Sequence, residues 1–498
     1  MKKYIVLFSI VAFISSVLFF SCNNTPSFPN DNVEKGYYLA RKYCKSCHLF
    51  PEPALLDKKT WTQYVLPKMG ELLGFRYMGQ NAYFEDGQQS ISREDWNKIL
   101  LYYYTSSPSE VIERKEDISI QKGLNLFTVT IPNYAVKSPA TTMVYIDTAE
   151  SVVYFGDGAG RQLYVWSDGQ IKDSLSIGTG ISNLRKDGNE YWALTMGVLY
   201  PSDQKVGTLV SIDRISKKQT TILDSLRRPV YASYTDLNND SLEDIIISEF
   251  GDKTGALSWF ENTGNNSYHQ HILKALPGAI ETAVHDFNKD GQMDIVALMA
   301  QGDEGLFLFY NLGNGKFREE RLVQLPPSYG SNSFQLADFN SDGFLDIIAT
   351  NGDNGDYPLV LKAYHGIRIY LNDGKNKFKE VLFLPVNGIG KVVAKDFDQD
   401  GDLDLASIAY FPDYTQKPEE GFIYWENKGK LLFEPSSIKE VSDGRWITLD
   451  ANDVDNDGDI DLVLGNANFS VGNIPSQLKN KWDIKSPSIL LLKNSYHK

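Results

Sequence analysis

The segment Cys44-Lys45-Ser46-Cys47-His48 sets two thiols two residues apart, directly before an imidazole. A Cys-x-x-Cys pair serves as a disulfide, a redox dithiol or half of a zinc site, and a following histidine adds covalent haem attachment. In haem attachment the two thiols join the vinyl groups on one edge of the porphyrin, and the histidine becomes the proximal iron ligand. The choice between these chemistries depends on the surrounding residues.

Three alternatives to haem fit the flanking sequence poorly. A thioredoxin-like dithiol follows a strand and opens a helix, whereas residues 31–43, before the motif, have an amphipathic helical pattern. A structural zinc site needs two further ligands, and residues 23–115 contain no other Cys or His. A simple disulfide leaves His48 without a role. The sequence therefore predicts haem c, held covalently by Cys44 and Cys47 with His48 as an axial ligand.

A second amphipathic helix is predicted over residues 92–105. Ser92 and Asp95 have the spacing of a helix N-terminal cap, and one helical face carries Trp96, Ile99, Leu100 and Tyr103. Residues 31–105 thereby resemble a class I cytochrome c domain, in which the first and last helices cross and a glycine, here Gly36, allows close approach. The resemblance implies a small all-α haem domain.

The sixth iron ligand is left to two methionines, because the predicted domain holds no second histidine. Met69 lies in a helical stretch beside Pro67 and Gly70, whereas Met78 lies in a less regular segment. We favour Met69, since Pro67 frees the local backbone and Gly70 permits close approach. Met78 remains the alternative.

Five Asp-rich segments recur 50 to 58 residues apart, beginning at Asp236, Asp286, Asp338, Asp396 and Asp453. Each has oxygen side chains at positions 1, 3, 5 and 9 and, except in the first copy, Gly at position 6, which suits a Ca²⁺ loop. An apolar run follows position 9, so each loop leads into a strand and not into an EF-hand helix. The predicted ligands are Asp236, Asn238, Asp240, Asp244; Asp286, Asn288, Asp290, Asp294; Asp338, Asn340, Asp342, Asp346; Asp396, Asp398, Asp400, Asp404; and Asp453, Asp455, Asp457, Asp461.

Repeats of this length with several short strands are typical of propeller blades. The motifs resemble the FG-GAP/VCBS repeats of calcium-bound β-propellers, over residues 123–498. Two degenerate blades before Asp236 bring the expected number to seven, and residues 125–133 are predicted to complete the last blade. The loops between second and third strands carry Phe250, Tyr357, Tyr364, Tyr410, Phe411 and Phe469, which could form a binding surface or pack between blades.

The N-terminus predicts export. Residues 1–21 combine Lys2 and Lys3 with an apolar run and a small residue before Cys22, which resembles a bacterial lipoprotein signal with Cys22 as the lipidation site. An uncleaved membrane anchor is the alternative. Residues 22–30 would form a tether and residues 106–122 a linker. The net charge of −15 argues against nucleic-acid binding, and five bound divalent ions would offset most of it.

Three functions follow as hypotheses. The first, which we favour, is an electron-transfer protein, lipid-anchored to a bacterial membrane on the periplasmic side or the cell surface, with haem c, up to five Ca²⁺ and a redox partner protein. The second is a haem-linked propeller dehydrogenase. The third is an adhesion or glycan-binding lipoprotein, with a glycan or protein as the propeller's ligand. The chain shows no nucleophile–base set, so an electron carrier or binding protein is favoured over an enzyme.

Overall fold

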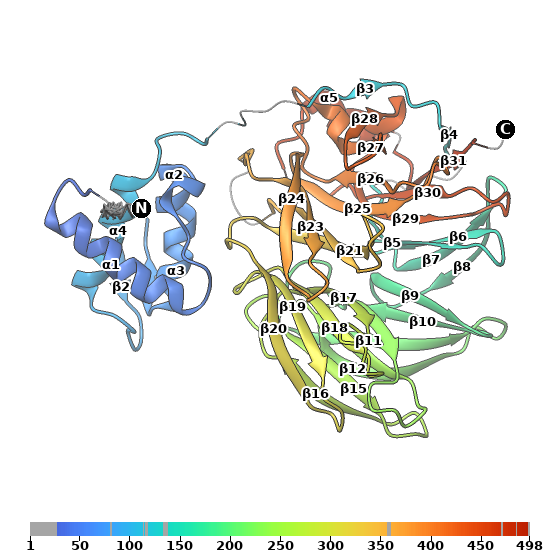
Figure 1. Cartoon of the computed structure of the whole chain (residues 1–498), viewed down its shortest axis with the longest axis horizontal. Helices are drawn as coiled ribbons and strands as arrows, with labels where there is room; N and C mark the ends of the chain where they lie inside the picture. Colours follow the sequence, from blue (N-terminus) through green and yellow to red (C-terminus); the bar gives the residue numbers. More distant parts are fainter. Residues whose placement is uncertain are drawn as a thin grey trace, which may run out of the picture.

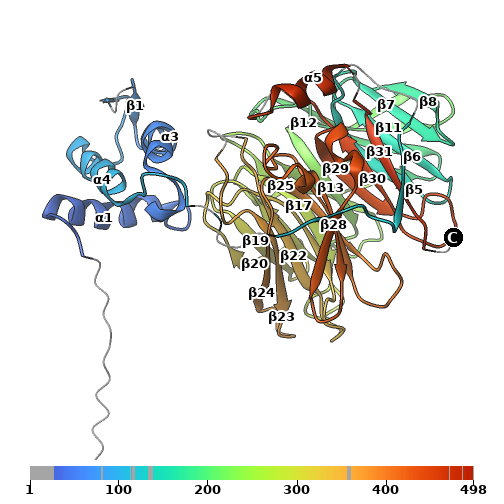
Figure 2. The same ribbon diagram turned by 90° about the horizontal axis from the view of Figure 1, so that it is seen from above.

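The structure is a computed structural model that describes residues 27–79, 82–112, 114, 118–132, 138–355, 360–469, 472–484 and 486–496. The predicted signal peptide and Cys22 lie outside these residues. Figures 1 and 2 show two separate bodies, a small helical unit and a larger propeller of β-sheets. Within the described residues, no helix has the length and apolar character needed to cross a membrane.

The helical unit contains four α-helices, three short turns and one hairpin. The helices are α1 (Asp31–Tyr43), α2 (Lys58–Thr60), α3 (Leu66–Leu72) and α4 (Arg93–Ser106), and the turns are η1 (Cys44–Ser46), η2 (Pro53–Leu55) and the π-type η3 (Trp61–Val65). The strands β1 (Phe75–Tyr77) and β2 (Tyr83–Glu85) pair antiparallel. This hairpin corrects the all-α expectation, because the segment after α3 turns back on itself at the positive-φ residue Gly79.

Helices α1 and α4 pack at a glycine, as predicted. The Ser92 side chain accepts the Asp95 N–H at the start of α4, and Trp96 and Ile99 are fully buried. A Cβ on Gly36 would overlap the Lys98 carbonyl and the Tyr102 Cβ. The two helix backbones can therefore touch only because residue 36 has no side chain.

Seven antiparallel sheets form the propeller (Figure 1). The first four are β5 (Thr141–Asp147), β6 (Val152–Asp157), β7 (Gln162–Ser167), β8 (Gln170–Ser176); β9 (Ile181–Asp187), β10 (Glu190–Thr195), β11 (Lys205–Asp213), β12 (Gln219–Arg227); β13 (Pro229–Thr235), β14 (Asp244–Glu249), β15 (Ala256–Asn262), β16 (Tyr268–Lys274); and β17 (Ala279–His285), β18 (Asp294–Met299), β19 (Gly305–Asn311), β20 (Phe317–Gln324). The other three are β21 (Ser331–Ala337), β22 (Asp346–Asn351), β23 (Gly366–Asn372), β24 (Phe378–Pro385); β25 (Ile389–Lys395), β26 (Asp404–Ala409), β27 (Phe422–Asn427), β28 (Phe433–Ser437); and β29 (Trp446–Asn452), β30 (Asp461–Asn466), β31 (Ile489–Asn494) with β4 (Phe127–Thr130). The expected seven blades, including the two degenerate ones, are confirmed.

The second strands of the last five blades explain the apolar runs in the repeats. Each of β14, β18, β22, β26 and β30 is buried at all of its residues. Neighbouring blades cover both faces of these strands, so a continuous apolar run replaces the alternation of a half-exposed strand.

The last blade is closed by a strand from the start of the propeller. Strand β4 pairs antiparallel with β31, joining Val129 to Leu492, and Phe127 packs edge-on against Phe397 and Tyr424. The prediction that a strand within residues 125–133 completes this blade is confirmed by β4 at Phe127–Thr130, and the pairing covers an edge that would otherwise be open.

Two segments differ from expectation. Residues 106–122, expected as a linker, include β3 (Gln121–Lys122), which pairs parallel with β28, and Arg114 forms an ion pair with Glu420. Helix α5 (Ser476–Ile484) lies between β30 and β31 and buries Trp482, whose indole donates to the Ser442 carbonyl. Its short apolar pattern gave little signal in the sequence.

Candidate functional site

The cysteine motif lies at the C-terminal end of α1. Cys44 is the C-cap residue of α1, and its side chain is buried whereas that of Cys47 is exposed. Both are free thiols. The half-buried His48 places Nδ1 2.8 Å from the Leu49 carbonyl oxygen, and a backbone acceptor at Nδ1 leaves Nε2 as the nitrogen that can ligate a metal.

The surroundings of Cys44 disfavour a thiolate. Burial raises the pKa of the Cys44 thiol to about 11, and this outweighs the opposing effect of a hydrogen bond with Tyr103. The Tyr103 hydroxyl also donates to the Pro51 carbonyl at 2.8 Å. A redox dithiol depends on a lowered thiol pKa, so this environment does not suit one.

The two methionines occupy different environments. Met69 lies on α3 and packs against the core cluster that includes Cys44, whereas Met78 is 64% exposed just after β1. A Cβ on Gly70 would lie 3.1 Å from both Tyr83 and Trp96. The chain stays helical through Pro67, because Pro67 is in the first turn of α3, where a proline costs no helix hydrogen bond.

Two buried donors of the helical unit lack a partner. The Tyr83 hydroxyl and the Trp96 indole N–H make no hydrogen bond within the described residues, and their rings contact edge to face at 5.5 Å. Burial raises the pKa of Tyr83, so its hydroxyl keeps its proton. Unsatisfied buried donors are costly, and an anionic acceptor such as a haem propionate would satisfy these two. Together with Cys44, Cys47 and His48 they are compatible with a haem.

The five Asp-rich loops share one backbone conformation. In each, the position-1 Asp accepts the backbone N–H of position 6, and the position-9 Asp accepts that of position 2. Position 6 has positive φ in all five, including Ser241 at 70°. The first copy therefore keeps the turn even though it lacks glycine there.

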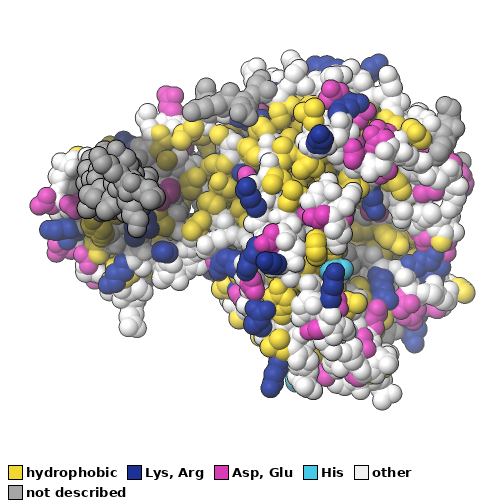
Figure 3. Space-filling model, viewed as in Figure 1, with side chains coloured by type: hydrophobic (Ala, Val, Ile, Leu, Met, Phe, Trp, Pro, Cys, Tyr) yellow, Lys and Arg dark blue, Asp and Glu magenta, His cyan; other side chains and the backbone are white. Residues whose placement is uncertain are grey.

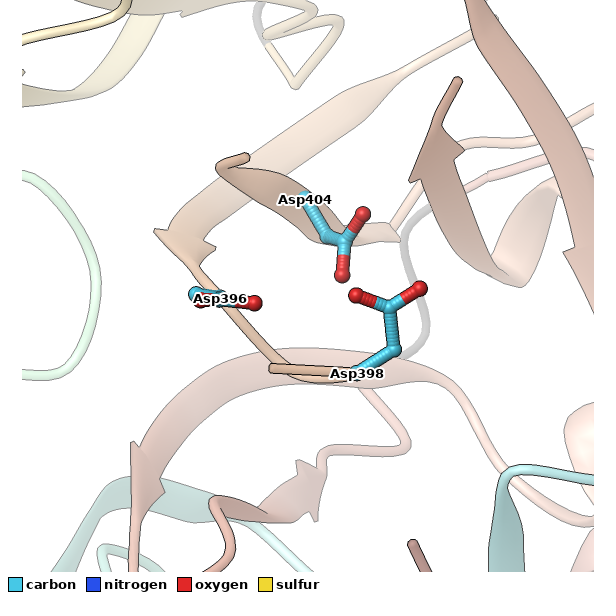
Figure 4. Close-up of side chains that lie close together, drawn as sticks. All are labelled: Asp396, Asp398 and Asp404. Atoms are coloured by element: carbon cyan, nitrogen blue, oxygen red, sulfur yellow. The ribbon is translucent and has the colours of Figure 1, made fainter. Parts of the chain in front are cut away.

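Two of these loops bring three carboxylates together. Asp396, Asp398 and Asp404 each offer an oxygen within 4.8 Å of the others, and Figure 4 shows the Asp398 and Asp404 carboxylates facing one another. The second group is Asp453, Asp455 and Asp461. The first three loops have Asn at position 3, which adds an amide oxygen in place of a third carboxylate.

Burial sets the electrostatics of the position-9 carboxylates. Asp404 and Asp461 are almost fully buried, and desolvation raises the pKa of Asp404 to about 6 and that of Asp461 to about 7. Neighbouring carboxylates, Asp398 and Asp455 respectively, add to the effect. A divalent cation would offset both costs, so the chemistry of these groups fits Ca²⁺.

The first blade has a group of ion pairs at the position where the last five blades have Asp-rich loops. Lys186, on β9, reaches Asp147 at 2.6 Å and Glu150 at 2.7 Å in the β5–β6 turn. Arg214 also pairs with Glu150, and these cations lower the pKa of Glu150 to about 2, against the effect of burial. The acidic turn is thus neutralised by side chains of the next blade.

Four of the six loop aromatics meet at one place. Phe250, Tyr410, Phe411 and Phe469 line a cavity of about 750 Å³ on the propeller axis. Tyr364 does not: it is stacked on Tyr329 at 4.7 Å. Tyr357 lies outside the described residues.

The cavity also contains charged residues that the sequence reasoning missed. They are Arg228, Glu281, Asp353, Lys391 and Asp450. The sequence signal that could have found them is a charged residue within an innermost strand, such as Glu281 in Ala279–His285.

Figure 3 shows Lys and Arg scattered among Asp and Glu over the described residues of one face.

The fold and its repeats define a seven-bladed β-propeller that carries FG-GAP-like repeats. The family model of the FG-GAP-like repeat matches residues 236–297 and 286–349, which hold the first three Asp-rich loops. Cartilage acidic protein 1 of Xenopus tropicalis is 30% identical over 194 residues, covering 35% of this chain and 28% of that protein. The Mus musculus protein is 32% identical over 169 residues, covering 32% and 24%. The match thus spans about a quarter of these relatives' length.

Among solved structures, the N-terminal domain of Nup159 aligns with a TM-score of 0.43 at 12% identity, covering 76% of this chain and 98% of that one. Saccharomyces cerevisiae Sqt1 aligns with a TM-score of 0.44 at 8% identity, covering 74% and 98%.

Proposed function

We propose that the chain is an exported, lipid-anchored c-type cytochrome, in which Cys44, Cys47 and His48 hold haem and a Ca²⁺-stabilised propeller serves as a docking scaffold. The observation that carries the proposal is the Cys-x-x-Cys-His motif at the end of a helix that crosses α4 at Gly36. When bound, haem supplies one-electron redox chemistry.

No disulfide joins Cys44 and Cys47, so both thiols are available for thioether formation. The unpartnered donors of Tyr83 and Trp96 would donate hydrogen bonds to a haem propionate. Of the two methionines, Met69 is the proposed sixth ligand, because it packs against the cluster that contains Cys44.

The chain's own residues then have distinct tasks. Cys44 and Cys47 would hold the cofactor covalently, and His48 would bind it through Nε2, since Nδ1 lies beside the Leu49 carbonyl. The aromatic rings of Phe75, Tyr83 and Trp96 exclude water from the interior. Excluding water and providing a thioether ligand both raise a haem potential. The redox partner would be another protein that meets the helical unit.

The test is a pyridine haemochrome assay on protein expressed with a bacterial cytochrome c maturation system. We expect covalent haem in the wild type and its loss in Cys44→Ser with Cys47→Ser. Met69→Ala should abolish the absorption band of methionine-ligated ferric haem, and Met78→Ala is the matched control that should keep it. Absence of covalent haem from the wild type overturns the proposal.

The anchor is tested separately with Cys22→Ser. The variant should move from the membrane fraction to the soluble fraction and should lose metabolic labelling by palmitate. Unchanged membrane association without labelling would instead indicate the uncleaved anchor.

A further inference from the structure

The propeller axis contains a cavity of ligand-binding size. Its volume is about 750 Å³, within the range of roughly 300–1,000 Å³ that is usual for small-molecule pockets. All seven innermost strands contribute to its wall, and the loops between second and third strands form its mouth. The Asp-rich loops join first to second strands, so they lie at the opposite end of the axis.

The mouth of the cavity is lined with aromatic rings from four loops. Tyr200 and Phe469 come from two of them, with ring centroids 6.1 Å apart, and Tyr200 is 58% exposed. Phe411 stands edge-on to Tyr410 at 4.9 Å, and Tyr410 is held by Arg445, whose guanidinium lies 3.9 Å from its ring centre. Phe250 is backed by the Arg228 guanidinium at 5.1 Å. The contacts of Tyr410 with Arg445 and of Phe250 with Arg228 restrict the motion of these two rings, which lowers the entropy lost when a ligand binds.

Two carboxylates and an amine line the interior. Glu281 accepts the Phe334 N–H at 3.0 Å, and Asp450 accepts the Ile146 N–H at 2.7 Å, each through one oxygen. Burial raises the pKa of both groups, and the Lys391 ammonium opposes this in each case. Lys391 thus faces both acids from β25, while Glu281 lies on β17 and Asp450 on β29.

The wall of the cavity carries charges of both signs: the acids Glu281, Asp353 and Asp450 and the bases Arg228 and Lys391. Arg228 donates from Nε and Nη2 to the Leu199 carbonyl and is attracted to Asp353, and burial lowers the pKa of Arg228 to about 10. An anion would meet Glu281 and Asp450, and a cation would meet Lys391 and Arg228. A wholly apolar ligand would leave these charged groups desolvated and unpaired.

We propose that this cavity binds a short neutral saccharide. Its hydroxyl groups would donate to Glu281 and Asp450 and accept from Lys391, and the rings of Phe250, Phe411 and Phe469 would cover the apolar C–H faces of the sugar. A neutral polyol can donate to the carboxylates and accept from the cationic side chains without meeting repulsion from either sign of charge on the wall. This site is independent of the haem, since its residues all belong to the propeller.

The experiment is isothermal titration calorimetry of the full-length protein in Ca²⁺ with a panel of cellobiose, maltotriose, laminaritriose, lactose and chitobiose. We expect at least one to bind with a Kd at or below about 1 mM. Phe411→Ala and Glu281→Gln should each weaken binding by roughly tenfold or more. Phe84→Ala is the matched control, because Phe84 is an exposed aromatic residue of the helical unit.

A second variant tests the location without removing a polar group. Ala300 lines the cavity, so Ala300→Trp should block binding while circular dichroism remains unchanged. Failure of the whole panel to bind at about 10 mM overturns the proposal, as does unchanged affinity in folded Ala300→Trp. Preference for charged galacturonate oligomers over the neutral panel overturns the choice of ligand.

Discussion

A Cβ placed on Gly36 would lie 2.1 Å from the carbonyl oxygen of Lys98, so α1 and α4 meet at a point that admits no side chain. Gly36→Ala should therefore force the helices apart and destabilise the helical unit by about 1–3 kcal/mol, the usual cost of overpacking. Thermal denaturation followed by circular dichroism measures the change. The exposed neighbour Lys35→Ala should have little effect, and an unchanged melting temperature for Gly36→Ala would contradict the packing described.

Removing calcium should destabilise the propeller, because the carboxylates of its loops would be left to repel one another. Chelation with EDTA should lower the melting temperature of the wild type, and Asp404→Asn should lower it in Ca²⁺ by an amount equivalent to about 1–3 kcal/mol. Asp402→Asn is the matched control: Asp402 is exposed and, at position 7, would offer its backbone carbonyl. Equal melting temperatures with and without EDTA would refute Ca²⁺ stabilisation.

The first Asp-rich loop should gain stability from a glycine. Ser241 adopts a φ of 70°, and this conformation costs an L-residue roughly 1–2 kcal/mol. A glycine would avoid this strain, but the greater flexibility of glycine in the unfolded chain offsets part of the gain. Ser241→Gly should therefore stabilise the protein by about 0.5–1 kcal/mol in urea unfolding. Ser241→Ala removes the same hydroxyl and keeps the strained backbone. Equal stabilisation by Ser241→Ala would show that relief of backbone strain is not the cause.

Closure of the ring by β4 should depend on Phe127. Its side chain is 5% exposed and contacts Phe397 and Tyr424, so Phe127→Ala should cost about 3–5 kcal/mol. Ile131→Ala, just beyond the strand and 40% exposed, should cost far less. Urea denaturation of the two variants gives the comparison, and a similar midpoint for both would mean that β4 does not hold the last blade.

Propeller stability should fall with rising pH because of Glu304. Burial raises the pKa of this carboxyl to about 7, against the opposing hydrogen bonds from Ser331, compared with an ordinary value of 4.5. At a pH below the ordinary pKa, the Glu304 carboxyl is protonated in both the folded and the unfolded protein. Above that pH the unfolded chain loses the proton while the folded protein still keeps it. The stabilising contribution is therefore lost between about pH 4.5 and 7, by up to about 3 kcal/mol.

Glu304→Gln tests this pH dependence. Glutamine keeps the acceptor for Ser331 and does not titrate, so its unfolding free energy should vary less with pH over that window. Glu434→Gln, on an exposed position of β28, should keep the wild-type profile. Parallel profiles for wild type and Glu304→Gln would exclude Glu304 as the source.

Local signals in the sequence were enough to predict α1, α4 and the seven blades. The helix patterns around Gly36 and Trp96 depend on contacts within and between two amphipathic helices, and each of the last five blades repeats an Asp-rich loop followed by a buried strand. The β1–β2 hairpin and α5 were missed, because their few residues carry little periodicity and form through tertiary packing, as with Trp482 against Ser442.

By itself, the sequence determined the chemistry available in each of the two parts of the protein. These are the thiols and imidazole of Cys44, Cys47 and His48 in the helical unit, and the carboxylates of the five loops in the propeller. These groups are close neighbours along the chain, so their spacing alone brings them together. Only the tertiary structure joined Glu281, Lys391 and Asp450 at one cavity. They come from three blades, and the closed ring of strands is what turns their side chains toward a common axis.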